Sequence, residues 1–178
     1  MARGERVIAI SRFIADLVAE RHGTPPSRIR LIPRGVDPRR FDPAAVPAAR
    51  VLALREAWGA APGQQVVLLP ARLTRWKGQM VLVEALARLP GVIGVLAGGG
   101  GDAFARELKD RAASLGLGQR LVLAGHVDAL DVALRAADVV VHASTDAEAF
   151  GRTVIEAQAM ARPVIASDPV SYTHLTLP

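Results

Sequence analysis

The chain has 178 residues, 51% of them apolar, and its 22 lysines and arginines exceed its 17 aspartates and glutamates. This length predicts one well-buried domain with a modest extra segment, and the net charge of +5 predicts attraction to anions such as phosphates. The absence of cysteine excludes disulfides, zinc fingers and cysteine nucleophiles, and the scarcity of aromatic residues argues against a nucleic-acid partner.

The first segment is predicted to be a strand followed by a helix and a second strand. The apolar run Val7–Ile10 leads into Ser11, a favourable N-cap, and the helical spacing that follows ends at Gly23. A short strand is predicted next, at Ile29–Ile32. No stretch reaches the roughly 18 apolar residues that a membrane span requires.

A proline-rich stretch separates this segment from the rest of the chain. It extends to Pro47, which is expected to open a helix in which Val51, Leu54 and Trp58 recur at helical spacing. We interpret residues 33–65 as an interdomain linker and helix.

From Val66 onward, apolar runs alternate with segments that have an apolar helical face, such as Leu82, Leu86 and Leu89. The apolar runs are Val66–Leu69, Val92–Ala97, Leu121–Ala124, Val139–Val141 and Val164–Ala166. This alternation predicts an α/β fold with a Rossmann-like, doubly wound parallel sheet. Ligands of such sheets bind at the carboxyl ends of the strands.

Two cations follow the first of these strands. Arg72 and Lys77 lie five residues apart around a turn that ends at Gly78, so both are placed to bind one anion such as a diphosphate. The alternative is a pair of solvated surface charges.

A glycine run, Gly98–Gly101, follows the second strand and leads into a helix. Such a loop permits close approach of a ligand to the backbone. It also matches a dinucleotide-binding pattern through Gly98, Gly100 and Ala103, which leaves an NAD-type dehydrogenase as an alternative. That pattern, however, belongs after the first strand of its unit.

Two carboxylates, Glu148 and Glu156, are separated by seven residues, the first in a loop and the second in the helix that follows Gly151. The free amides at the start of this helix favour phosphate and sugar hydroxyls. The alternative places Glu148 as a charge that favours the helix dipole and Glu156 as a partly exposed helix residue. The histidines His126, His142 and His174 are interpreted as packed or loop residues.

In this order and spacing, the motifs resemble glycosyltransferase family four, the retaining GT-B enzymes also described as glycosyl transferases group 1. The motifs are Ile32-Pro33-Arg34-Gly35-Val36-Asp37 with Phe41, Ala71-Arg72-Leu73 with Lys77-Gly78, Glu148-x7-Glu156, and Pro163-Val164-Ile165-Ala166-Ser167. The resemblance runs from about Val7 to Ser167. It implies transfer of a sugar from a UDP-, GDP- or ADP-linked donor, with retention of configuration and with neither cofactor nor metal.

The resemblance also implies roles for individual residues. Arg72 and Lys77 would neutralise the donor diphosphate, while Glu148 would lie against the donor sugar and Glu156 would accept hydrogen bonds from the ribose. The remaining donor contacts would come from the amides of Phe150, Gly151 and Arg152, from Gly99 and Gly100 lining the pocket, and from Val127 beside the base.

The resemblance divides the chain into four parts. Residues 1–32 correspond to the end of an acceptor-binding domain that is otherwise absent, residues 33–65 to the linker and helix, and residues 66–167 to the nucleotide-sugar-binding domain. Residues 168–178 have no counterpart and are interpreted as a non-native tail. We therefore expect the chain alone to lack transfer activity.

The acceptor would be a glycan or a lipid-linked molecule bound by the missing domain. The sequences of the motifs resemble those of bacterial enzymes of lipopolysaccharide and other cell-surface polysaccharide biosynthesis. This resemblance implies a cytoplasmic protein. The basic charge leaves open a peripheral contact with the inner membrane. A noncatalytic nucleotide-binding module on the same scaffold is the main alternative function.

Overall fold

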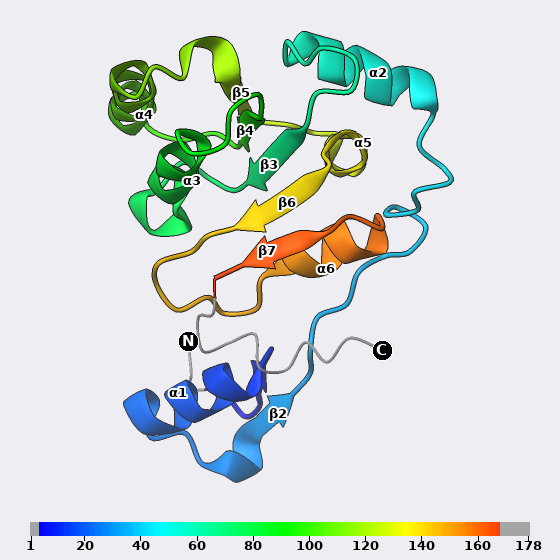
Figure 1. Ribbon diagram of the computed structural model, residues 1–178. Helices are drawn as coiled ribbons and strands as arrows, with labels where there is room; N and C mark the ends of the chain where they lie inside the picture. Colours follow the sequence, from blue (N-terminus) through cyan, green and yellow to red (C-terminus); the bar gives the residue numbers. More distant parts are fainter. Residues whose placement is uncertain (1–3, 168–178) are drawn as a thin grey trace.

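The computed structural model describes residues 4–167 and shows a small lobe below a larger one (Figure 1). The small lobe consists of β1 (Val7–Ala9), α1 (Arg12–His22), the 3-10 helix η1 (Pro26–Arg28) and β2 (Ile29–Leu31), with β1 and β2 paired in parallel. Ser11 caps α1 by accepting a hydrogen bond from the Ile14 amide, as predicted, and Gly23 ends the helix in the left-handed conformation. The predicted non-native tail, residues 168–178, lies outside the described residues.

The larger lobe contains a five-stranded parallel sheet in the order β5-β4-β3-β6-β7. Its elements are α2 (Ala48–Ala57), β3 (Val66–Pro70), η2 (Arg75–Lys77), α3 (Gln79–Leu86), β4 (Ile93–Ala97), α4 (Asp102–Ser114), η3 (Gly118–Arg120), β5 (Leu121–Gly125), α5 (Leu130–Ala136), β6 (Val139–His142), α6 (Arg152–Ala159) and β7 (Val164–Ala166). This confirms the predicted doubly wound α/β fold.

Each face of the sheet is covered by its own helices, because successive side chains of a strand point to opposite faces. On one face, Leu68 of β3 and Val140 of β6 join a core with α5 and α6. On the other face, Leu69 of β3 and Leu96 of β4 pack with α3 and α4. Full burial of each leucine contributes about 1.5–3 kcal/mol.

Residues 33–65, predicted as linker and helix, contribute directly to this lobe. Phe41 and Trp58 are each 4% exposed and belong to the α5–α6 core. Arg55 of α2 donates hydrogen bonds to the Ala136 carbonyl (2.7 Å) and to the Asp138 carboxylate (3.1 Å). The segment is therefore packed against the larger lobe along much of its length.

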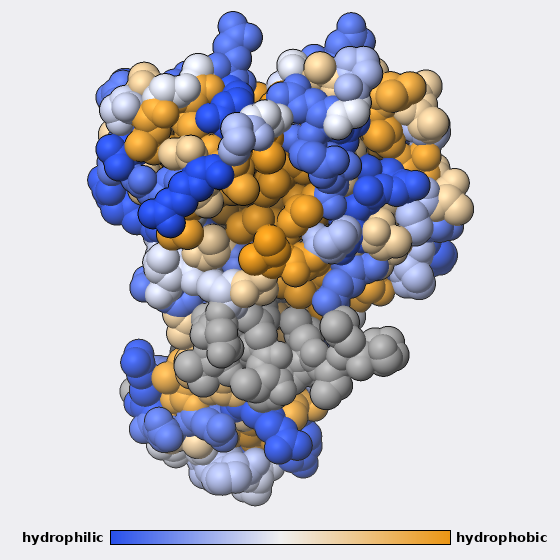
Figure 2. Space-filling view, in the orientation of Figure 1, coloured by the Kyte–Doolittle hydropathy of each residue, from blue (hydrophilic) through white to orange (hydrophobic). Residues whose placement is uncertain are grey.

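At β6 and β7, helices of residues 4–167 cover one face of the sheet, and the other face forms the wall of a groove. On the α3 side of β6 and β7, apolar side chains including Val139, Val141 and Ile165 line a groove of about 780 Å³. Ile165 is 63% exposed, and Figure 2 shows apolar residues at the surface of the larger lobe. Leu89, predicted to lie on a helical face, instead follows the end of α3 and is 43% exposed on the rim of this groove, which corrects that prediction.

No helix between residues 4 and 167 is both long enough and apolar enough to cross a membrane.

Candidate functional site

The loops that follow the parallel strands meet at one edge of the sheet. The Leu73 amide donates to the Gly99 carbonyl (2.9 Å), which joins the loops after β3 and β4. The Gly98 amide donates to the Gly125 carbonyl (2.7 Å) and joins the loops after β4 and β5. Thr153, in the first turn of α6, donates through its hydroxyl to the Pro70 carbonyl (3.4 Å). The start of α6 therefore lies beside the end of β3.

Gly78 brings the turn after β3 against the end of β6. Its backbone has a φ of +72°, and a Cβ placed on it would lie 1.8 Å from the Ala143 carbonyl oxygen. Only glycine allows this approach without displacement of the backbone. A hydrogen bond from the Thr145 amide to the Trp76 carbonyl (2.8 Å) also holds the two segments together. Lys77 therefore faces the loop after β6.

Lys77 forms an ion pair with Glu148, and each side chain is only 14% exposed. The Lys77 ammonium also lies 4.0 Å from the centroid of the Trp76 ring, a favourable cation–π distance. Two predicted site residues that are 71 positions apart in the sequence are thus in direct contact. A partly desolvated pair of this kind interacts more strongly than a surface pair.

Two further side chains approach the same Glu148 oxygen, Oε2. The Ser144 hydroxyl donates to it across 3.3 Å, and His142 Nε2 lies 3.6 Å away. Burial lowers the pKa of His142, the Lys77 charge lowers it further, and the Glu148 charge opposes them. The sequence interpretation of His142 as an ordinary packed residue missed this contact; the one available signal was a polar residue ending a buried strand.

Arg72 lies in the same loop but is not part of this contact. Its side chain is exposed, and its carbonyl accepts a 2.7 Å hydrogen bond from the buried Gln79 amide group. Within residues 4–167, no ion pair joins Arg72 to an acidic side chain. Its role at the diphosphate remains a prediction.

The helix α6 begins after Gly151 and has no acidic residue in its first turn. Phe150 and Gly151 are buried, and the first amides of the helix have no acceptor within the helix itself. By contrast, α4 carries Asp102 in its first turn, where a carboxylate already interacts with the helix dipole and would repel a second anion. Of these two helices, α6 is therefore the better suited to bind a phosphate.

Glu156 is buried within α6, with a side chain only 7% exposed. Its Oε1 accepts a hydrogen bond from Arg152 Nη2 at 2.8 Å, and the Arg152 side chain is 57% exposed. The alternative interpretation of Glu156 as a partly exposed helix residue is thus wrong. Buried carboxylates are rare unless paired, and here the paired cation, Arg152, is itself largely exposed.

The glycine loop after β4 contains positions with different surroundings. A Cβ at Gly100 would lie 2.3 Å from the Leu73 Cβ, so this glycine is needed for packing between the two loops. A Cβ at Gly99 would meet nothing within 4 Å, which leaves open space beside that residue. Val127, in the loop after β5, is partly buried against the α5–α6 core.

The small lobe reaches the same region through one side chain. The Ser11 hydroxyl donates a 3.1 Å hydrogen bond to the Ala149 carbonyl, next to Glu148, and Ser11 is 3% exposed. The start of α1 therefore contacts the loop that carries the first carboxylate.

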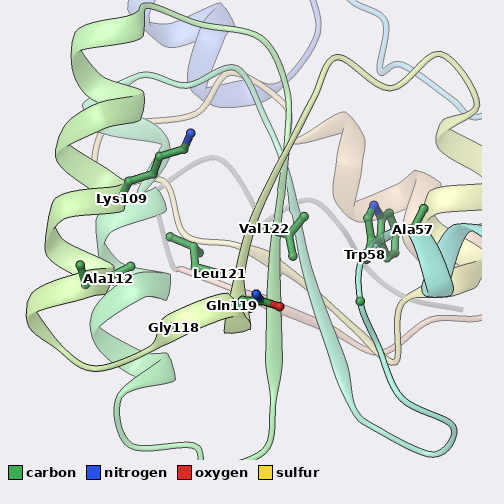
Figure 3. A pocket seen from close by; sticks show the side chains of 10 residues that line it. Ala57, Trp58, Lys109, Ala112, Gly118, Gln119, Leu121 and Val122 are labelled. Atoms are coloured by element: carbon green, nitrogen blue, oxygen red, sulfur yellow. The ribbon is translucent and has the colours of Figure 1, made fainter.

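A separate hollow of about 520 Å³ lies away from these loops (Figure 3). It is lined by Trp58 after α2, by Lys109 and Ala112 of α4, and by Leu121 and Val122 at the beginning of β5. Because the strands are parallel, the beginning of β5 is at the edge opposite to Lys77 and Glu148. In the part of the chain that the structure describes, no three His, Cys, Asp or Glu side chains form a group able to hold a metal.

Known proteins are similar to this chain over most of its length. It is 34% identical over 168 residues to a D-inositol 3-phosphate glycosyltransferase of Mycobacteroides abscessus, covering 92% of this chain and 37% of the relative. It is 35% identical over 173 residues to a protein of the same name from Xylanimonas cellulosilytica, covering 94% and 41%. The chain thus spans about two fifths of the length of these curated relatives.

Solved structures with the same fold include Anabaena HepE in complex with UDP and glucose. Its TM-score is 0.84 at 30% identity, covering 92% of this chain and 44% of HepE. A glycosyltransferase of Rickettsia africae has a TM-score of 0.84 at 32% identity, covering 93% and 45%. WaaG, a glycosyltransferase involved in lipopolysaccharide biosynthesis, has a TM-score of 0.83 at 21% identity and shows the fold alone.

Two family models match the chain, one at its beginning and one over most of the rest. Residues 1–40 match Glycosyltransferase Family 4, and residues 52–175 match Glycosyl transferases group 1. The second match covers more than half of the chain and contains Arg72, Lys77, Glu148 and Glu156. The chain therefore belongs to the glycosyl transferases group 1 family.

Proposed function

We propose that the chain supplies the donor site of a retaining glycosyltransferase that transfers a sugar from a nucleotide-diphosphate donor to an acceptor. The observation that carries this proposal is the Lys77–Glu148 pair at the carboxyl edge of the sheet. A cation for phosphate and a carboxylate for sugar hydroxyls lie side by side there, next to the amino end of α6. A nucleotide sugar carries a diphosphate for the cation next to sugar hydroxyls for the carboxylate.

The donor in this proposal carries UDP. Its support is the similarity to HepE, whose structures contain UDP, UDP-glucose, or UDP and glucose, at 28–30% identity. GDP- and ADP-linked sugars are the competing donors, because the diphosphate and sugar contacts proposed here are independent of the base.

In the proposed reaction the sugar–phosphate bond breaks and negative charge grows on the leaving diphosphate. Lys77, which is paired with Glu148 in the structure, also attracts the phosphates through its ammonium charge. Arg72 approaches them from the exposed side of the loop. The amides of Phe150, Gly151 and Arg152 add the positive end of a helix dipole. Glu148 and Glu156 bind hydroxyls of the donor sugar and of the ribose.

In this reaction the acceptor hydroxyl attacks the anomeric carbon on the face from which the diphosphate leaves. Its oxygen forms the new glycosidic bond as the sugar–phosphate bond breaks, its proton passes to the departing phosphate, and no protein nucleophile takes part. The acceptor is proposed to be a glycan or lipid-linked molecule held by residues of an N-terminal domain. The names of the curated relatives favour a second class, a phosphorylated inositol. For the glycan or lipid-linked acceptor, the proposal includes a cytoplasmic location and a peripheral contact with the membrane.

The first experiment measures thermal stabilisation of the 178-residue chain by UDP-, GDP- and ADP-glucose, with NAD as the control ligand. A ligand raises stability according to its affinity, so the panel identifies the base without an acceptor. We expect UDP-glucose to raise Tm most and NAD to leave it unchanged. Stabilisation by NAD alone would favour the dehydrogenase alternative and contradict the proposal.

A transfer assay separates an enzyme from a noncatalytic nucleotide-binding module. UDP-glucose would be offered with a phosphorylated inositol or a lipid-linked glycan, to this chain and to a longer protein that joins it to an acceptor domain. We expect binding by both proteins but transfer by the longer one only. Binding without transfer in the longer protein, with every acceptor tried, would favour the noncatalytic module.

A further inference from the structure

His142 is a buried polar residue next to the proposed site that the proposed reaction does not use. It ends β6 and is 5% exposed. Because it follows Val140 at a spacing of two, its side chain lies on the same face of the sheet, the face covered by α5 and α6. An imidazole in that place is costly to bury unless it serves an interaction.

Within residues 4–167, the polar contacts of the Glu148 carboxylate converge on one oxygen. Lys77 pairs with Oε2, the Ser144 hydroxyl lies 3.3 Å from it, and His142 Nε2 lies 3.6 Å from it. The three groups approach from η2, from β6 and from the loop that follows β6. Three contacts to one oxygen restrict the orientation of the carboxylate.

The backbone that carries His142 and Ser144 is itself held in place by the end of β7. The Ser167 amide donates to the His142 carbonyl (2.9 Å), and the Ser167 hydroxyl donates to the Ser144 carbonyl (2.7 Å). His142 is thus a fixed side chain on a fixed strand, whereas Glu148 lies in a loop.

We propose that His142 is a positioning residue that holds Glu148 toward the donor sugar and thereby lets the site distinguish a nucleotide sugar from the bare nucleotide. The proposal rests on the function proposed above and deepens it. His142 does not touch the donor; it acts through Glu148, so its loss weakens binding of the sugar and leaves binding of the diphosphate unchanged.

The test measures binding of UDP-glucose and UDP to the 178-residue chain by calorimetry at pH 7.5. The variant His142→Leu keeps an apolar bulk on this face and removes the ring nitrogens, while His142→Gln retains a nitrogen that reaches toward Glu148. The matched control is His22→Leu at the exposed end of α1. Unchanged UDP affinity serves as the internal measure that each variant is folded.

We expect His142→Leu to lower affinity for UDP-glucose by about five- to tenfold, the effect of losing one polar contact of typical net strength. UDP affinity should stay within about twofold, and His142→Gln should restore most of the loss. An equal fall for both ligands, or no fall for either, would overturn the positioning role while leaving the donor site intact. A wild-type chain that binds neither ligand would overturn the proposed function, and the positioning role with it.

Discussion

Arg75 and Lys77 lie on the same 3-10 turn, two residues apart, yet their surroundings differ. Arg75 pairs with Glu107 of α4 at 2.6 Å, with side chains 74% and 39% exposed. Lys77 pairs with Glu148 in a setting where each side chain is 14% exposed. The same kind of ion pair is thus a surface contact on one side of the turn and part of a candidate site on the other. Burial, rather than charge, distinguishes the two.

This comparison predicts its largest effect at Lys77. Replacement by methionine removes the cation that we propose binds phosphate and leaves Glu148 buried without its cation, a change that costs about 2–5 kcal/mol in comparable pairs. We expect Lys77→Met to lower UDP-glucose affinity by about 100-fold, measured by calorimetry. Lys77→Arg should recover part of the loss. An affinity within about threefold of wild type would show that the burial of this pair has no functional meaning.

The next effect concerns the glycine that brings the turn against β6. A Cβ at Gly78 would collide with the Ala143 carbonyl, so Gly78→Ala should lower the free energy of unfolding by about 1–3 kcal/mol and weaken UDP-glucose binding. Gly63→Ala is the matched control, because Gly63 has a similar φ of +77° with nothing within 4 Å of its Cβ position. Urea unfolding measures both variants. Equal losses would assign the whole effect to backbone strain and none to the contact with β6.

A smaller effect depends on pH and on His142. Burial and the neighbouring Lys77 charge lower its pKa in the folded chain below 6.5, with Glu148 opposing them. The unfolded chain therefore binds more protons just below pH 6.5, and stability is present above that pH and lost as the pH falls toward the folded-state pKa. We expect Tm to decrease between pH 7 and pH 5, and His142→Leu to reduce the decrease. A decrease of the same size in both proteins would contradict this assignment.

The smallest effect is expected at Arg75. Its guanidinium holds the pKa of Glu107 below the ordinary value through a hydrogen bond, but both groups are solvated. Exposed pairs of this type contribute little to stability. We expect Arg75→Met to leave Tm and UDP-glucose affinity unchanged in the same assays used for Lys77→Met. A loss approaching that of Lys77→Met would erase the distinction between the two sides of the turn.

Much of the fold could be predicted from the sequence because apolar runs and turn residues act locally. The five strands of the larger sheet were predicted to within one residue at either end, and Ser11 and Gly23 mark the ends of the first helix. The groove beside β7 was not predictable in the same way. Leu89 continues the spacing of Leu82 and Leu86, but α3 ends at Leu86, so helical periodicity alone misplaced it.

The sequence indicated Arg72, Lys77 and Glu148 as candidates through their positions at strand ends, and their roles stay predictions. The contact between Lys77 and Glu148, which Arg72 does not join, depends on long-range geometry. Contact between Lys77 and Glu148 requires the close approach of Gly78 to Ala143, which follows from the sheet order rather than from local pattern. The sequence marks His142 only as a packed or loop residue, because a lone histidine does not indicate which side chain it will contact.

The hydrogen bond from Ser11 to the Ala149 carbonyl links the smaller lobe to the peptide next to Glu148. Any rotation of that lobe about the proline-rich connection must either break this bond or pull on the peptide that adjoins Glu148. Motion between the lobes and the position of Glu148 are consequently coupled through the Ser11 hydroxyl.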